Sequence, residues 1–425
     1  MSKKYEIALS YAHKDQKIAD LLGEQLELVF ADGFFMDEYR PEELASAELF
    51  REKLKDIFSR SEYAVILYSQ NYSDGEFASV EKEQILEKEN REEWSHCFII
   101  NIDDCKIIEE QMKGLYYISL NISEMLQSNN GAEFGKQEVD WKKVEEKIHD
   151  MIEDKIKKKI IMQTAEKKKE QSEYLVRVQT LCPNGNKFQW DKDYDWNILG
   201  KAFIDADDGR CFKKNIRWQD FWQYVDNDFE WIKSNLRDMP DVKRRIHLNC
   251  HLSVAYKLGQ VYGDLRQASG NRNLVLESSN RNQKIEFAFH HTVSEKQTAD
   301  FCREYMGNCR ESADIVCIIS IKPKELGNVL EAVKQFLNRK GKKYCKIYLF
   351  QKEMILEDAD MLESMAAYLR EKMIACRNGR SECKIHLFPD TTAPLMFALG
   401  ARSVFPGTVQ LYEYIPKKDT YMIFP

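Results

Sequence analysis

The chain has 425 residues, of which 43% are hydrophobic and 31% are charged, and its formal net charge is −7. This composition excludes a disordered or fibrous chain, and the acidic balance argues against binding to the backbone of duplex nucleic acid. The sequence shows no signal-peptide core, no apolar run of membrane-spanning length and no zinc-site spacing among its 11 cysteines. We therefore expect a cytoplasmic protein with reduced, mostly buried cysteines and no bound metal.

Short apolar segments alternate with helical patterns over the amino-terminal third of the chain. A helix is expected at Lys17–Phe30. Strands separated by helices predict a parallel sheet with helices on both faces. The expected strands are Tyr5–Tyr11, Phe34–Asp37, Tyr63–Ser69, Cys97–Asp103 and Tyr116–Ile122.

A long amphipathic helix is expected from about Val139 to Gln171, because its apolar residues recur at steps of three and four. The lysine-rich run Lys155–Lys159 follows several acidic residues, and we interpret it as a solvated helix face. The apolar stripe is lost at the end of this helix. We therefore predict a first domain over residues 1–155, a helical linker over 156–171 and a second domain over 172–425.

The second domain contains two segments of similar sequence. Ile246–Gln260 and Ile385–Ala401 both begin with Ile-His-Leu, both predict a strand, a polar turn and a helix, and both end near a Leu-Gly pair. The starts lie 385 − 246 = 139 residues apart, and the Leu-Gly pairs at Leu258 and Leu399 lie 399 − 258 = 141 apart. This pattern favours a duplication, with two Rossmann-like halves in one domain.

The turns after these two strands are the expected ligand site, because open α/β sheets bind ligands beyond the carboxyl ends of their strands. Hydroxyl groups and N–H groups at a helix N-terminus bind phosphate well, so a ligand with repeated phosphates and bases would suit two facing turns. The alternative is that the serine and threonines are ordinary helix caps. The candidate ligand-binding residues are Asn249, His251, Ser253, Phe388, Thr391 and Thr392.

Three amino-terminal segments resemble a TIR domain, the Toll/interleukin-1 receptor fold. YEIALSYAHKD (Tyr5–Asp15) resembles the first box of the family, and FFMDEYRPEEL (Phe34–Leu44) resembles the second strand and the loop that gates the site. SQNYSDGEFASVE (Ser69–Glu81) resembles the pattern S-x-x-Y-x-x-S-x-W-C-x-x-E of NAD-cleaving members, with Gly75, Phe77 and Ala78 where Ser, Trp and Cys are usual. The resemblance implies a flavodoxin-like, five-stranded parallel sheet.

The same resemblance implies an NAD⁺ nucleosidase, with NAD⁺ as the substrate and no cofactor. Glu81 falls on the catalytic glutamate of the pattern. The nicotinamide ring is cationic in NAD⁺ and becomes neutral when it leaves, so no acid has to protonate the leaving group. One carboxylate can then stabilise the oxocarbenium-like ribose. The residues implied to contact NAD⁺ are Ser10, Tyr11, Asp37 and Phe77.

The carboxy-terminal segments HLSVAYKLG (His251–Gly259) and Leu387–Tyr414 resemble a SAVED domain, a fusion of two CARF-type halves that senses cyclic oligonucleotides. The whole chain then resembles the TIR–SAVED effectors of bacterial cyclic-oligonucleotide-based anti-phage signalling (CBASS). This implies NAD⁺ depletion in abortive infection, triggered by a cyclic oligonucleotide, with cyclic tri-adenylate as the leading candidate. It also implies a homo-oligomer or filament on activation.

Two other functions stay open. Many TIR domains are non-enzymatic scaffolds that recruit other TIR domains, and the substitutions at Phe77 and Ala78 leave room for such a role. A nucleoside-processing enzyme of similar fold is a third possibility.

Overall fold

The computed structural model forms two compact units, the first ending at Gln163 and the second beginning at Thr164. The structure describes residues 6–36, 47–73, 85, 96–103, 105, 115–128, 137–167, 173–179, 196–199, 243–262, 274–280, 283–289, 300–322, 328–377, 379–380, 382–402, 409–415 and 420–424.

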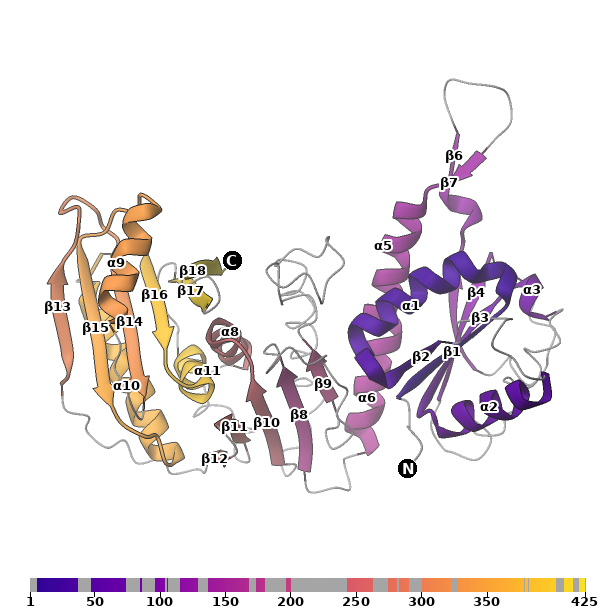
Figure 1. Cartoon of the computed structure of the whole chain (residues 1–425), viewed down its shortest axis with the longest axis horizontal. Coiled ribbons are helices and arrows are strands. Elements are labelled where there is room, and N and C mark those ends of the chain that lie inside the picture. Colours follow the sequence, from indigo (N-terminus) through magenta and orange to yellow (C-terminus); the bar gives the residue numbers. More distant parts are fainter. Residues whose placement is uncertain are drawn as a thin grey trace. The chain divides into compact units, whose positions relative to one another are not determined.

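The first unit is built on a five-stranded sheet of order β2-β1-β3-β4-β5, in which every neighbouring pair is parallel (Figure 1). This is the flavodoxin-like strand order, and it confirms the predicted parallel sheet. Every residue of β3 and β4 is buried, as expected for central strands covered on both faces. The strands are β1 (Ile7–Tyr11), β2 (Phe34–Met36), β3 (Tyr63–Tyr68), β4 (Cys97–Ile102) and β5 (Tyr116–Leu120), and the helices between them include α1 (Gln16–Phe30), α2 (Ala47–Arg60) and α3 (Gln70–Ser73).

The long helix after the sheet contains a π-helical segment that the sequence pattern did not predict. It consists of α5 (Trp141–Met151), the π-helix η6 (Ile152–Lys157) and α6 (Lys158–Lys167). The interpretation of the lysine run as a solvated face is wrong for Lys157, which is 4% exposed and donates to Glu153 Oε2 at 2.8 Å. The extra residue in a π-helical turn moves this lysine to the buried side of the helix.

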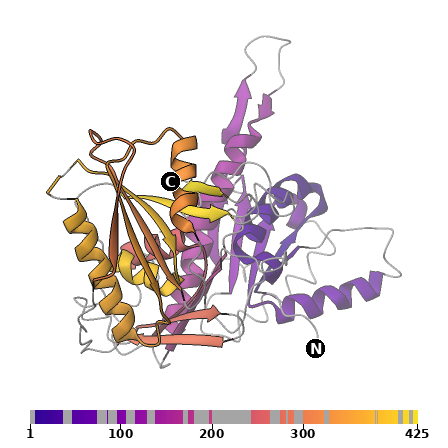
Figure 2. The same cartoon turned by 60° about the vertical axis from the view of Figure 1, so that its left-hand side comes forward.

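The predicted beginning of this helix is also corrected. Val139 closes a short antiparallel hairpin, visible in magenta in Figure 2, that consists of β6 (Leu126–Ser128) and β7 (Gln137–Val139). The helix begins two residues later at Trp141, with the Asp140 side chain accepting a hydrogen bond from the Lys143 N–H. An aspartate cap of this kind explains the boundary.

The second unit contains two sheets with matching topology. One has the order β12-β11-β10-β8-β9 and the other β18-β17-β16-β14-β15-β13. The strands of the first are β8 (Glu173–Gln179), β9 (Trp196–Leu199), β10 (Lys243–Asn249), β11 (Leu274–Asn280) and β12 (Gln283–Phe289). Those of the second are β13 (Cys302–Met306), β14 (Ile315–Lys322), β15 (Lys346–Glu353), β16 (Ile385–Asp390), β17 (Val409–Ile415) and β18 (Thr420–Phe424).

The two sheets correspond strand by strand. In each, an antiparallel outer strand, β12 or β18, precedes four parallel strands, and the second sheet adds the antiparallel β13 at its far edge. The helix α8 (Leu252–Tyr262) follows β10, and α11 (Ala393–Arg402) follows β16. The internal repeat that the sequence predicts is therefore confirmed in the topology of the unit.

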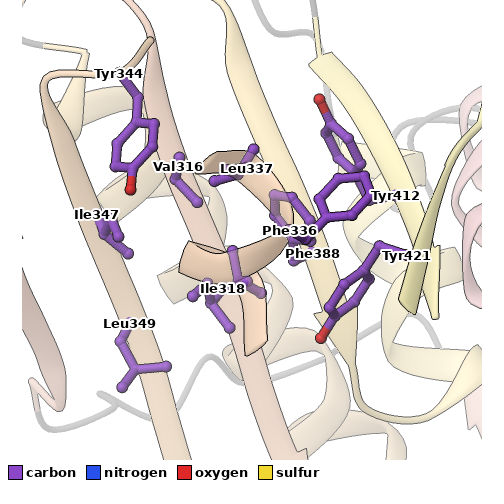
Figure 3. Packing of buried hydrophobic residues seen from close by; sticks show 11 residues of the cluster. Val316, Ile318, Phe336, Leu337, Tyr344, Ile347, Leu349, Phe388, Tyr412 and Tyr421 are labelled. Atoms are coloured by element: carbon purple, nitrogen blue, oxygen red, sulfur yellow. The ribbon is translucent and has the colours of Figure 1, made fainter. Parts of the chain in front are cut away.

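The helices α9 (Val329–Arg339) and α10 (Ala359–Cys376) belong to the second half. The α9 side of its sheet carries an aromatic cluster in which Phe388 stacks on Tyr412, with ring centroids 4.2 Å apart, and meets Phe336 and Tyr421 edge-on (Figure 3). Alternate strand residues face opposite sides, so Phe388 points into this cluster and the next residue points to the other face.

Two further expectations concern the whole chain. Among the described cysteines none forms a disulfide, and Cys97, Cys250, Cys317 and Cys383 are buried whereas the other five are partly exposed. The expectation of mostly buried thiols is thus met by fewer than half of them. In the part of the chain that the structure describes, no helix has the length and apolar character needed to cross a membrane.

The helices α8 and α11 pack against each other through two glycines. A Cβ atom on Gly259 would lie 2.0 Å from the carbonyl oxygen of Phe397, and one on Gly400 would lie 1.9 Å from the carbonyl oxygen of Tyr256. Phe397 lies three residues before Gly400, and Tyr256 lies three residues before Gly259, so each glycine meets the same position on the opposite helix. The crossing is therefore symmetric, and only residues without a Cβ allow the backbones to approach so closely.

Either glycine changed to alanine should destabilise the second unit. Gly259→Ala and Gly400→Ala should each cost roughly 1–3 kcal/mol, despite the better helix propensity of alanine, because the added methyl group meets backbone atoms that cannot move alone. Denaturant unfolding of the full chain measures the loss.

The double variant should be little less stable than the worse single variant, because one displacement of the helices relieves both contacts. Gln335→Ala, at an exposed position of α9, is the control and should leave stability nearly unchanged. Fully additive losses in the double variant would contradict a shared crossing.

Candidate functional site

In the first unit, the segments that follow β1 and β3 are joined by a buried hydrogen-bond network. The hydroxyls of Ser10 and Tyr72 share a hydrogen bond of 2.9 Å. Asp15 accepts from the Ser69 hydroxyl and, at 2.8 Å, from Asn71 Nδ2. The Tyr72 N–H donates in turn to Ser69 Oγ at 3.1 Å. Both segments lie at the carboxyl ends of parallel strands, where this fold places its ligands.

This network joins the carboxyl ends of β1 and β3. Asp15 is 9% exposed, and a buried carboxylate is tolerated only where donors satisfy it. Tyr72 is 2% exposed, and its ring lies 5.8 Å from that of Tyr68 in the core between the sheet and its helices. The start of the segment after β3 is therefore fixed to the segment after β1 by both polar and apolar contacts.

The four residues predicted to contact NAD⁺ divide into two groups. Ser10 and Tyr11 lie together at the end of β1; Ser10 is buried, and the partly exposed Tyr11 donates its hydroxyl to Gln16 Oε1 at 2.9 Å. Asp37 and Phe77 lie outside the described residues.

The predicted catalytic residue Glu81 also lies outside the described residues. The described residue that follows it is Ile85, which is 4% exposed and packs in the same core cluster as Tyr68 and Tyr72. Glu81 thus stays a prediction from the sequence, whereas its neighbours in the motif, Ser69 and Tyr72, are seen to be structural.

In the first half of the second unit, the N-terminus of α8 is occupied by a carboxylate. Glu413 on β17 accepts from the Leu252 N–H at 3.3 Å, from the Ser253 N–H at 3.0 Å and from the Ser253 hydroxyl at 2.7 Å. Ser253 is fully buried and Glu413 is 8% exposed. A phosphate at Ser253 would have to displace this carboxylate, because both anions use the same donors.

The corresponding turn in the second half is arranged differently. The Thr391 hydroxyl donates to the Ile321 carbonyl at 3.0 Å, and the preceding Asp390 forms an ion pair with Lys322. Thr392 lies at the start of α11, and its carbonyl accepts the Met396 N–H at 3.2 Å. Among the described residues its hydroxyl, although buried, has no hydrogen-bond partner.

The other predicted ligand-binding residues differ in their exposure to solvent. Asn249 ends β10 and is partly exposed, and His251, also partly exposed, accepts the Ala255 N–H at 3.0 Å through its carbonyl. Phe388 is 1% exposed inside the aromatic cluster, so its ring offers no face to a ligand in this structure. The sequence analysis missed Glu413, and its signal was a single acid within the apolar strand VQLYEY.

These observations place two similar strand–turn–helix elements in one unit, with their helices crossing at the paired glycines. A family model described as "SMODS-associated and fused to various effectors sensor domain" (SAVED) matches residues 230–423. This segment is a SAVED domain. The match covers both strand–turn–helix elements and stops short of the amino-terminal sheet. A comparison with curated proteins gives no match.

Solved structures with similarity to this chain include receptors of the same domain type. The Cap4 SAVED/CARF-domain containing receptor of Acinetobacter baumannii with the cyclic trinucleotide 3'3'3'-cAAA has 12% identity and a TM-score of 0.42, over 96% of this chain and 97% of that chain. The Cap4 receptor of Moraxella osloensis has 13% identity and a TM-score of 0.37, over 89% and 84% of the respective chains. Similarity of this degree transfers neither ligand nor activity to this chain.

The network at β1 and β3 predicts coupled stability effects. Asp15→Ala and Ser69→Ala should each destabilise the first unit by about 1–3 kcal/mol, because each leaves a buried polar partner unsatisfied. The double variant should be less damaging than the sum by at least about 0.5 kcal/mol.

Denaturant unfolding, followed by tryptophan fluorescence and by circular dichroism, measures the free energy of unfolding of the wild type, the two single variants and the double variant. Glu52→Ala removes an exposed acid of α2 and should have little effect. Strictly additive losses for Asp15 and Ser69 would show that the two side chains do not act as one network.

Proposed function

We propose that this chain is a sensor–effector protein of a CBASS-type anti-phage system, in which the SAVED domain binds a cyclic oligonucleotide and the amino-terminal unit then cleaves NAD⁺. The observation that carries the proposal is the SAVED match over residues 230–423, on a chain whose other unit has the strand order of a flavodoxin-like fold. The TIR resemblance of Tyr5–Asp15 and Ser69–Glu81 supplies the enzymatic part.

The duplicated architecture supports a single ligand shared by the two halves. A cyclic oligonucleotide repeats phosphates and bases around a ring, and two related turns on either side of a pseudo-twofold axis can bind such a ring from both sides. Thr392 at the N-terminus of α11 would contact a phosphate, whereas Asn249 and His251 would act from the other half. Ser253 would join them only after Glu413 releases it.

In the amino-terminal unit, the proposed reaction breaks the bond between nicotinamide and ribose. Glu81 would stabilise the oxocarbenium-like ribose, and water would then complete hydrolysis. The hydrogen bonds that join the ends of β1 and β3 support a ligand site there, because this fold binds its ligands beyond the carboxyl ends of its parallel strands. Ser10 and Tyr11 would lie beside the substrate at the end of β1.

We further propose that ligand binding acts through assembly. The amino-terminal units of several chains would pack into a homo-oligomer or filament, and the loop after β2, which includes Asp37, would complete the NAD⁺ pocket at the contact. Such a mechanism keeps the enzyme inactive in the cytoplasm until the messenger appears, because a pocket shared between chains does not exist in a single chain.

Turnover of NAD⁺ should depend on a cyclic oligonucleotide. A fluorescent NAD⁺ analogue, incubated with the full chain and a panel of cyclic di- and trinucleotides, should be cleaved with one or a few ligands, cyclic tri-adenylate first among them. Turnover at full rate without any ligand would contradict the switch, and ligand binding without turnover would favour the scaffold.

Glu81→Gln should abolish NAD⁺ cleavage, because it preserves the shape of the side chain and removes its charge. Binding of the activating nucleotide, measured by calorimetry, should be unchanged. Glu83→Gln is the matched control two residues away and should retain turnover. Activity that survives in Glu81→Gln and is lost in Glu83→Gln would move the catalytic role to Glu83.

The competing function is a non-enzymatic scaffold that recruits partners once the nucleotide binds. Phe77 and Ala78 in place of the usual Trp and Cys favour it. The two functions differ in one cellular quantity, since only the enzyme lowers total NAD⁺ when the chain is expressed together with its activating nucleotide.

A further inference from the structure

A cavity of about 160 Å³ lies in the SAVED domain at the amino ends of the parallel strands β14 and β15. Its walls come from the start of both strands, from the segment that follows β13 and from the end of α10. Strands of eight residues separate it from the turns at Thr391 and Thr392, a distance of about 25 Å. The cavity is therefore distinct from the proposed nucleotide site.

Basic side chains dominate the lining of this cavity. Arg310, Lys346, Arg377 and Arg380 contribute to it, and no aspartate or glutamate is among its lining residues. Glu304 lies at the edge and pairs with Lys346 at 2.6 Å. Among the described residues, no carboxylate forms an ion pair with Arg310 or Arg380, so these two side chains add positive charge to the wall of the cavity.

Arg377 is the most informative of these residues because it is only 5% exposed. Its Nη2 group donates to the Arg380 carbonyl at 3.1 Å, which holds the guanidinium in a fixed orientation. Taking a guanidinium out of water is costly, and a planar group with several N–H donors is well matched to oxyanions. The exposed Arg310 and Arg380 lie on the same cavity and can close over a bound anion.

The cavity has room for a small anion. Its volume of about 160 Å³ exceeds the space that a single water molecule needs, so a tetrahedral oxyanion fits together with some water. The basic lining favours such an oxyanion over a neutral ligand.

We propose that this cavity is a second, separate anion site of the SAVED domain that binds inorganic phosphate or a single terminal phosphoryl group. Arg377 forms its fixed base, and Arg310 and Arg380 its mobile sides. The site does not depend on NAD⁺ cleavage. Its structural alternative is that Arg377 and Arg380 only neutralise the negative C-terminal end of the α10 dipole.

The test is titration calorimetry of the full chain with inorganic phosphate and with AMP, against sodium chloride of equal ionic strength. The variant Arg310→Gln/Arg380→Gln changes two exposed side chains and should fold normally. It should bind phosphate about a hundredfold more weakly, since each of the two lost charge-assisted hydrogen bonds is worth about tenfold. Broadening of the ³¹P signal provides a second readout, because phosphate also stabilises proteins without binding.

The control is Arg303→Gln/Arg339→Gln, which removes the same charge from exposed positions outside the cavity and should bind phosphate as the wild type does. An equal loss of phosphate affinity in both double variants would show that only the overall charge matters, and would contradict a specific site. Absence of phosphate binding in the wild type would overturn it too. A cavity variant that loses thermal stability but keeps phosphate affinity would assign the arginines to the end of α10 alone.

Discussion

The SAVED domain depends on one close approach, the crossing of α8 and α11 at Gly259 and Gly400. Each glycine lies against the carbonyl three residues before the other, so the contact repeats itself across a pseudo-twofold axis. In addition, α8 contacts β16 and β17 of the other half, and α11 contacts β10 and β11. Each half thus covers its apolar surface with a helix from its counterpart, and neither half is complete alone.

The two related turns differ in charge, and this difference follows from the same crossing. Because α8 packs on the sheet of the second half, Glu413 of β17 reaches the N-terminus of α8 and occupies its donors. The start of α11 retains the Thr392 hydroxyl. The two halves therefore share a topology but have different turns. The proposed contacts of a cyclic oligonucleotide differ between the two halves for the same reason.

Strands with a continuous apolar run could be predicted from sequence because their signal is local, as at Tyr63–Tyr68, which is buried throughout. The two Leu-Gly pairs likewise indicated the internal repeat. The interior strands β8 and β11 and the edge strands β12 and β13 were not predicted, since polar residues alternate with their apolar ones or interrupt them. The π-helical segment at Ile152–Lys157 left no sequence signal, because it changes the register of a continuous helix.

Site residues were harder to predict, since their roles depend on partners distant in sequence. Ser253 was recognised as a phosphate ligand or a cap, but only the fold brings it to Glu413, 160 residues away. Phe388 belongs to an aromatic core shared with Tyr412 and Tyr421, which no spacing along the chain indicates. In the first unit, Asp15 stood within a recognised motif, yet its bonds to Ser69 and Asn71 required the parallel pairing of β1 with β3.

We propose that the two halves of the SAVED domain act as one sensor because they share a crossing and a ligand. The most direct measurement is the binding stoichiometry of cyclic tri-adenylate, or of whichever cyclic oligonucleotide activates the chain, determined by calorimetry on the 425-residue chain. We expect one ligand per chain, bound across the pseudo-twofold axis. Two independent ligands per chain, one at each turn, would show that the halves act separately.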